Sequence, residues 1–144
     1  MAVDWLGDCA IVSIIIDSNF LIMLSEIQIN IISELDRLVK REYELVALSG
    51  VITELKELLS KSKPKKRKKV EFALRFLKEQ NIKVLDEQFL PNETTDEYIL
   101  RIAKKTKFVV ATNDAKLKKK LKDANSSVIY LRQKSYLAED GFIG

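Results

Sequence analysis

The stretch IVSIIIDSNFLI, at residues 11–22, sets the architecture that we expect for this chain of 144 residues. Its first six residues are almost all β-branched and apolar, which is typical of a strand buried on both faces of a parallel sheet. The polar residues that follow are suited to ending this strand and capping a helix; they are Asp17, Ser18 and Asn19. We therefore predict a central strand that is followed at once by a helix.

The rest of the chain alternates strand-like and helix-like patterns. Short apolar runs at residues 45–48, 82–85, 108–111 and 128–131 predict four more strands, and apolar residues at helical spacing lie between them. This alternation indicates an α/β fold with three α/β/α layers around a central parallel sheet of four to five strands. A long polar segment after the third strand indicates that the strand order reverses there, which predicts the order 3-2-1-4-5. The tail from residue 136 has no assignable pattern.

The composition indicates one domain, residues 1–144, with an extra N-terminal segment at residues 1–11 and a tail at residues 138–144. Hydrophobic residues make up 47% of the chain and charged residues 32%, which allows a substantial core. There is no His and a single Cys, Cys9, which excludes an internal disulfide, Cys/His zinc sites and His-dependent triads. No segment reaches the roughly 18 apolar residues of a membrane span, and no secretory signal is evident, so we expect a cytoplasmic protein.

Cations are concentrated in two short stretches. Residues 61–69, KSKPKKRKK, carry seven cations in nine positions, with a hinge expected around Pro64, and residues 116–122 carry five in seven. This density favours a polyanionic partner such as RNA, while solvated helix faces on a Lys-rich protein are the alternative interpretation. The residues expected to contact phosphates are Lys63, Lys65, Lys66, Arg67, Lys68, Lys69, Lys116, Lys118 and Lys119.

Four acidic residues from distant segments are expected to meet at one edge of the sheet. In an open parallel sheet, ligands bind beyond the carboxyl ends of the strands, where the strand order reverses. Asp17 and Asp114 directly follow the first and fourth strands, Glu54 lies early in the helix after the second strand, and Asp96 opens the helix before the fourth. Taken singly, each is more simply explained as a helix cap, a partner of a helix dipole or an exposed residue.

Taken together, these four acids favour a metal site. Converging carboxylates repel one another unless a cation lies among them, and ligation by oxygen alone favours Mg²⁺ or Mn²⁺ over Zn²⁺. Placed beside lysine clusters, such a site indicates hydrolysis of phosphodiester bonds. A divalent ion activates water for this reaction without a His base.

Four motifs in this sequence resemble those of the PIN-domain nucleases. IIIDSNFLI at residues 14–22 resembles the family's first strand and its Asp-Ser/Thr-Asn motif, and VITEL at residues 51–55 resembles the motif that supplies its Glu. DEYILRIA at residues 96–103 and VVATND at residues 109–114 resemble the third and fourth motifs. The continuation to residue 137 resembles an archaeal branch similar to both VapC-type toxins and an rRNA-processing endonuclease.

The resemblance implies an endoribonuclease that depends on Mg²⁺ or Mn²⁺. Its acidic site would consist of Asp17, Glu54, Asp96 and Asp114. The motif positions expected to orient these carboxylates are Asn19, Thr112 and Asn113, for which simple turn chemistry is the alternative.

One position within the third motif offers two acids. Glu97 stands beside Asp96, so either is a candidate for the third acidic ligand. We prefer Asp96, because Ile99 and Ala103 then fall in the family's register.

The sequence leaves the biological role open between a VapC-like toxin, with an antitoxin partner, and an rRNA-processing factor, with a ribosome-assembly partner. A catalytically inactive RNA-binding or assembly module is the alternative from a different class. The family commonly pairs, and both chain ends add large apolar residues, so we expect a homodimer, with packing on the domain's own edges as the alternative. These residues are Trp5, Leu6, Tyr136, Leu137, Phe142 and Ile143.

Overall fold

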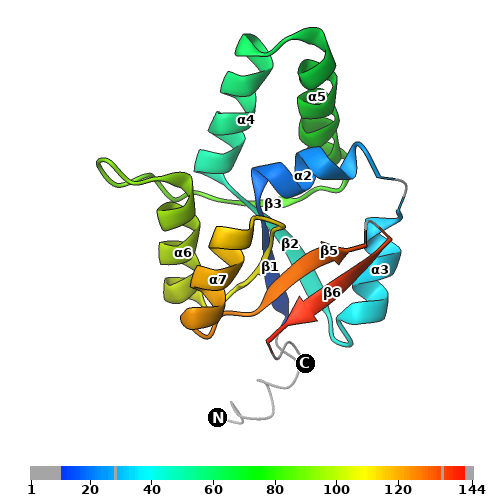
Figure 1. Ribbon diagram of the computed structural model, residues 1–144, viewed down its shortest axis with the longest axis vertical. Helices are drawn as coiled ribbons and strands as arrows, with labels where there is room; N and C mark the ends of the chain where they lie inside the picture. The colour runs from blue at the N-terminus through cyan, green and yellow to red at the C-terminus, as the bar shows by residue number, and fades with distance from the viewer. Residues whose placement is uncertain (1–10, 28, 134, 142–144) are drawn as a thin grey trace.

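One mixed sheet organises the part of the chain that the computed structural model describes, which is residues 11–27, 29–133 and 135–141 (Figure 1). Within these residues the strands are β1 (Val12–Ile16), β2 (Tyr43–Leu48), β3 (Lys83–Leu85), β4 (Val109–Ala111), β5 (Val128–Arg132) and β6 (Tyr136–Asp140). Their order across the sheet is β3-β2-β1-β4-β5-β6, and only the β5–β6 pair is antiparallel. The predicted α/β class and the order 3-2-1-4-5 are confirmed, and a sixth strand extends one edge.

β1 lies at the centre of the sheet because its residues are apolar on both faces. Ile14, Ile15 and Ile16 expose none of their surface, and the neighbouring Val110 of β4 is equally buried. Because β1 and β4 pair in parallel, their carboxyl ends lie at the same edge of the sheet, at the point where the strand order reverses.

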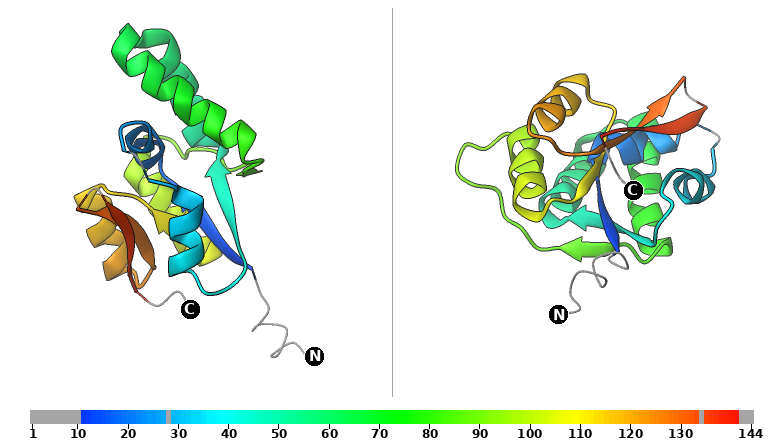
Figure 2. Two further views of the ribbon diagram at one scale, coloured as in Figure 1. Left: turned by 90° about the vertical axis from the view of Figure 1, so that its right-hand side faces the viewer. Right: turned by 90° about the horizontal axis from the view of Figure 1, so that it is seen from below.

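Helices cover the two faces of the sheet. They are α2 (Ser18–Leu24), α3 (Ile31–Leu38), α4 (Ser49–Lys61), α5 (Pro64–Glu79), α6 (Thr95–Thr106) and α7 (Ala115–Asp123). Seen from below, α6 and α7 lie on one side of the sheet, and α3 and α5 lie on the other (Figure 2). Helices α4 and α5 form a hairpin that projects past the carboxyl ends of the strands (Figure 1). None of the helices in the described residues is long and apolar enough to cross a membrane.

The hinge predicted around Pro64 coincides with a short turn between two helices, and its mobility stays a prediction. Pro64 is the first residue of α5, a position that suits proline because the first helical N–H has no partner within the helix. Only Ser62 and Lys63 separate α4 from α5. Most of the cationic stretch at residues 61–69 is therefore helical rather than a linker.

The tail contributes the sixth strand, which the sequence pattern did not indicate. Leu137 is 1% exposed, its N–H donates to Glu34 Oε1 over 3.0 Å, and its carbonyl accepts from Arg37 over 2.8 Å. The alternative that the chain ends pack on the domain itself is thus correct for Leu137, and the boundary proposed for the tail at residue 138 falls inside β6.

Most of the remaining residues behind the predicted homodimer lie outside the described part of the chain. These residues are Trp5, Leu6, Phe142 and Ile143. The same holds for Cys9 and for residues 1–10 of the extra N-terminal segment. The homodimer therefore stays a prediction.

Candidate active site

Asp17 lies where β1 ends and α2 begins, and it is only 3% exposed. It occupies the N-cap position of α2, yet its carboxylate does not bond to the helix; it accepts a hydrogen bond from Thr112 Oγ1 over 2.8 Å. Burial raises the pKa of Asp17 to about 6, the Thr112 hydrogen bond opposes this rise, and the charges of Glu54, Asp114 and Asp96 add to it. The helix-cap interpretation of Asp17 is therefore wrong, and the other three predicted acids act on it electrostatically.

Glu54 joins the first turns of two helices. Its Oε1 accepts a hydrogen bond from Ser18 Oγ of α2 over 2.7 Å, and its Oε2 accepts one from Thr95 Oγ1 of α6 over 2.9 Å. Glu54 is thus a half-buried residue between α2, α4 and α6 and not a freely exposed one. Neither donor was among the predicted site residues, and each stands directly beside a predicted acid in the sequence.

The two neighbouring acids of α6 have different surroundings. Glu97 forms a capping box: its carboxylate accepts from the Thr94 N–H over 2.9 Å, while Thr94 Oγ1 accepts from the Glu97 N–H over 3.2 Å. These bonds lower the pKa of Glu97. Burial and the charge of Asp114 raise the pKa of Asp96, against the lowering effect of Lys120 and Lys116. Asp96, rather than Glu97, is therefore the acid that is electrostatically coupled to the others.

Asp114 serves as the N-cap of α7, where its Oδ1 accepts a hydrogen bond from the Leu117 N–H over 2.9 Å. This position at the start of α7 agrees with the alternative for Asp114, a partner of the helix dipole, although its charge also acts on Asp17 and Asp96. The Asp114 N–H donates to Thr112 Oγ1 over 3.1 Å. The buried Thr112 hydroxyl therefore connects the acids that follow β1 and β4.

The three residues expected to orient the carboxylates have separate roles. Only Thr112 contacts a carboxylate. The Asn113 side chain exchanges two hydrogen bonds with the backbone of Leu131, at 3.0 and 2.7 Å, and so holds the loop after β4 against β5. Asn19 is exposed and lines a hollow between α2 and α5. Asn113 thus holds the backbone of the neighbouring strand β5, which is neither contact with a carboxylate nor a bond within its own turn.

Two lysines of α7 lie near the acids. Lys116 and Lys120 both lower the pKa of Asp96, as expected for residues four apart on the same face of a helix. Lys120 was not predicted as a site residue, and this spacing was the signal that could have found it. The ammonium of Lys118 lies 4.2 Å from the ring centroid of Tyr130 and is thus directed toward β5.

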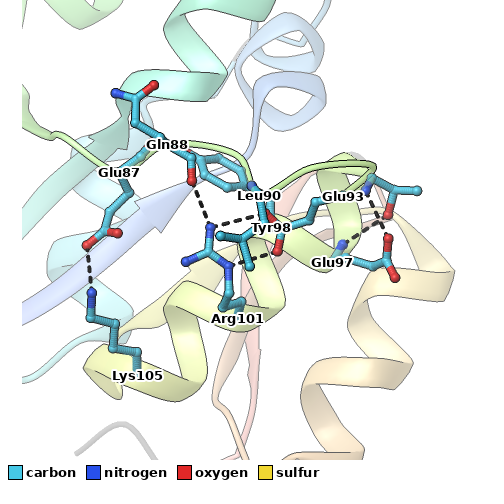
Figure 3. A network of polar contacts seen from close by, with 9 residues as sticks. Glu87, Gln88, Leu90, Glu93, Glu97, Tyr98, Arg101 and Lys105 are labelled. Carbon is cyan, nitrogen blue, oxygen red and sulfur yellow. Dashed lines mark hydrogen bonds and ion pairs between the residues drawn. The ribbon is translucent and has the colours of Figure 1, made fainter.

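The segment between β3 and α6 is fixed to α6 by an arginine (Figure 3). Arg101 donates to both carboxylate oxygens of Glu93, at 2.8 and 3.0 Å, and to the carbonyl of Gln88 over 2.8 Å. Glu93 in turn accepts from the Leu90 N–H over 2.9 Å. These bonds order the chain immediately before the helix that carries Asp96.

The fully buried Tyr98 connects the helices that carry Glu54 and Asp96. Its hydroxyl donates to the carbonyl of Glu87 over 2.7 Å and accepts from the Gly50 N–H over 3.0 Å. A Cβ atom at Gly50 would lie 2.7 Å from both the Phe89 ring and the Tyr98 hydroxyl, so this approach requires glycine. Tyr98 and Gly50 thus set the distance between α4 and α6 without touching the acids.

The four carboxylates suit a hard cation by their chemistry. Within the described part of the chain, no three His, Cys, Asp or Glu side chains are grouped closely enough to hold a metal ion. Three of the acids instead accept hydrogen bonds from hydroxyl or backbone donors. The four side chains nevertheless offer only oxygen atoms, and the pKa of Asp17, the most buried of them, is raised first by burial and then by its acidic neighbours. Carboxylate oxygens are the ligands that hard divalent cations prefer.

A sheet of this order, with acids following β1 and β4 at the point of reversal, defines a PIN-like domain. The family model of the PIN-like domain matches residues 14–134, and the chain belongs to this family. The resemblance of its four motifs is thereby confirmed.

Individual relatives extend this assignment. Ribonuclease VapC4 of Methanocaldococcus jannaschii is 37% identical over 131 residues, which cover 90% of this chain and 98% of that protein. The solved PIN domain endonuclease Utp24 matches with a TM-score of 0.74 at 20% identity, over 90% of this chain and 92% of that one. A domain of a functionally unknown Methanocaldococcus jannaschii protein matches with a TM-score of 0.61 at 19% identity, over 90% and 95% of the two chains. The solved structures share the fold, and the sequence relative is a ribonuclease.

Proposed function

We propose that this chain is an endoribonuclease that hydrolyses RNA with the help of Mg²⁺ or Mn²⁺. The observation that carries the proposal is the buried Asp17, whose raised pKa reflects both desolvation and three neighbouring acids at the end of the central strand. Membership of the PIN-like family and the 37% identity to a ribonuclease support it. The resemblance of the four motifs to this family implies dependence on a divalent metal ion.

Each acid has a distinct part in this proposal. Asp17, Asp96 and Asp114 would hold the ion, and Glu54 would complete its surroundings from α4. A bound divalent ion supplies activation of water and neutralises charge on the phosphate. Thr112 fixes Asp17 in place, and a pKa of about 6 leaves this carboxylate ionised at neutral pH. Lys116 and Lys120 offset the negative charge beside Asp96 and would attract the RNA backbone.

A VapC-like toxin is the first candidate for the biological role. The similarity to Ribonuclease VapC4 covers nearly the full length of both chains. The likeness to Utp24, at 20% identity, concerns the fold. We therefore propose an antitoxin as the protein partner, ahead of a ribosome-assembly factor. Growth arrest on expression, relieved by a cognate antitoxin, would separate the toxin from a processing factor.

The decisive test is incubation of the purified protein with total RNA, with Mg²⁺, with Mn²⁺ and with excess EDTA. We expect fragments with 5′-phosphate ends only when metal is present. The Asp17→Asn variant should remain folded and inactive, whereas Asp123→Asn, an exposed acid at the far end of α7, should cleave normally. Cleavage in excess EDTA would overturn the metal dependence. RNA binding without cleavage by the unaltered chain would identify an inactive binding module instead.

A further inference from the structure

A basic hollow lies between α2 and α5, beside the acids but separate from them. It encloses about 510 Å³ and is lined by Asn19, Ile22, Glu26, Lys63, Lys65, Lys66 and Lys69. We call it the α2–α5 hollow. Its size suits one or two nucleotide units of a bound strand rather than a single ion.

The lining of the α2–α5 hollow is cationic and carries no aromatic side chain. Four lysines face one carboxylate, Glu26, which forms an ion pair with Lys69. Ile22 is the single apolar residue of this lining. Proteins that bind single-stranded nucleic acids hold the bases mainly by stacking on aromatic rings, and hold the phosphates with lysines and neutral hydrogen-bond donors. The lining therefore suits a phosphodiester backbone.

The first turn of α2 separates the hollow from the acids. Ser18 points toward α4, where its hydroxyl donates to Glu54. The next residue, Asn19, is exposed and faces the lysines of α5. A strand whose phosphates occupy the hollow thus has only this one helical turn to cross before it reaches Asp17.

Resting on the proposed ribonuclease function, we propose that the α2–α5 hollow binds the phosphates of the RNA segment next to the cleaved bond. Lys65 and Lys66 neutralise these phosphates, and the Asn19 amide donates to a phosphate oxygen. Asn19 is thus a substrate-binding residue rather than one that orients the carboxylates. Sequence selectivity does not come from this contact, because phosphates are the same in every RNA.

The helical form of the cationic stretch provides a matched control. Lys65 and Lys66 line the hollow, whereas Lys61 and Lys68 are also exposed on the same hairpin and lie outside its lining. Lys68 was predicted from the sequence to contact phosphates, so this control also tests that prediction. The variants Lys65→Gln/Lys66→Gln and Lys61→Gln/Lys68→Gln each lower the formal net charge from +4 by two. A difference between them therefore reports position and not total charge.

Binding of a single-stranded RNA oligonucleotide in EDTA, over a salt series, tests the proposal without cleavage. The Lys65/Lys66 variant should bind roughly tenfold more weakly at low salt and lose about 1.4 from the slope of log affinity against log salt, since about 0.7 is lost per phosphate contact. The Lys61/Lys68 variant should lose less than half as much. Asn19→Ala should bind about threefold more weakly with an unchanged slope, because a neutral donor displaces no counterion.

Three outcomes would overturn the inference. Equal losses in the two double variants would show a diffuse electrostatic effect, and no loss in either would show that RNA avoids the hollow. An acidic peptide of the same charge that binds as tightly as the RNA, and is equally weakened by Lys65→Gln/Lys66→Gln, would identify a protein partner there. The binding assay contains no metal, so its result does not depend on cleavage. The proposed function fails separately, if cleavage persists in EDTA or never occurs.

Discussion

The acidic corner, formed by Asp17, Glu54, Asp96 and Asp114, and the cationic stretch at residues 61–69 are built in opposite ways. The acids are far apart in sequence, yet three of them help to raise the pKa of Asp17, which is almost completely buried. The cations are adjacent in sequence, yet a helix turns each residue by about 100° from the last and distributes them over several faces.

This difference shows that charge density along a chain is a poor measure of charge density in space. Lys65 and Lys66 reach the α2–α5 hollow, while Arg67 turns back and donates to the carbonyl of Ser62 over 3.1 Å. Substitutions in the acidic corner should therefore have large, coupled effects. Those in the cationic stretch should have small effects that depend on the helix face, because exposed charges are screened by solvent.

The largest effect on cleavage is expected at Asp96, and its neighbour Glu97 serves as the contrast. Asp96→Asn should reduce metal-dependent RNA cleavage by a factor of about 100 or more, the usual scale for removing a group that stabilises charge at the reaction centre. Glu97→Gln should cleave like the unaltered protein, because glutamine preserves the capping box with Thr94. Initial rates on one RNA with saturating Mn²⁺ measure both. The reverse result would place Glu97 in the site and Asp96 outside it.

The second prediction concerns stability and pH in the acidic corner, measured in EDTA. The pKa of Asp17 rises from 3.8 to about 6 on folding, so the folded protein holds this proton more tightly than the unfolded chain. The stability that this proton contributes is complete below about pH 4 and is lost as the pH rises through 6. Asp17→Asn removes the penalty, and should be more stable than the unaltered protein by about 3 kcal/mol at pH 8 and equal to it near pH 3.5.

Urea denaturation at the two pH values measures this difference. The exposed control Asp123→Asn should match the unaltered protein at both. A stability gain for Asp17→Asn that does not change with pH would show that folding does not raise the pKa of the Asp17 carboxylate.

The central strand and the position of the acids were predictable from the sequence, whereas the sixth strand was not. Five β-branched residues among residues 11–16 indicate β1, and the rule that ligands bind at the reversal point then locates the acids. β6 was missed because its sequence, YLAED, contains one buried residue and two acids. That strand depends on pairing with β5 and on contacts of Leu137 with Glu34 and Arg37. These contacts join distant parts of the chain, so the local sequence pattern does not predict them.

Side-chain direction was the main limit within the site. Thr112 and Asn113 are adjacent polar residues after β4, but the turn directs the first toward Asp17 and the second toward Leu131. Asn19, two residues after Asp17, lines the α2–α5 hollow. The sequence specified which residues gather at the sheet edge, whereas their hydrogen-bond partners depend on backbone geometry that only the folded chain defines.

The third prediction concerns the contact between Gly50 of α4 and Tyr98 of α6, which lies outside the acidic corner. Gly50→Ala places a Cβ atom 2.7 Å from the Phe89 and Tyr98 side chains, and should lower the free energy of unfolding by about 1–3 kcal/mol. Tyr98→Phe, which leaves the Gly50 N–H and the Glu87 carbonyl without this hydroxyl, should cost about 1–2 kcal/mol. Thermal or urea unfolding measures both, with Tyr130→Phe, a half-buried tyrosine on β5, as the control. Gly50→Ala with unchanged stability would show that the α4–α6 contact is loose.

The smallest effect is expected for Arg67, within the cationic stretch. Its guanidinium donates to the carbonyl of Ser62 near the end of α4, so it acts as a link between the two helices of the hairpin. Arg67→Gln should lower stability by about 0.5 kcal/mol, the low end for one hydrogen bond at an exposed position. It should change the salt slope of RNA binding far less than Lys65→Gln, for which we expect a loss of about 0.7. Urea unfolding and RNA titration of the two single variants measure both quantities, and equal slopes would mean that the cationic stretch binds RNA by its total charge instead of by one helix face.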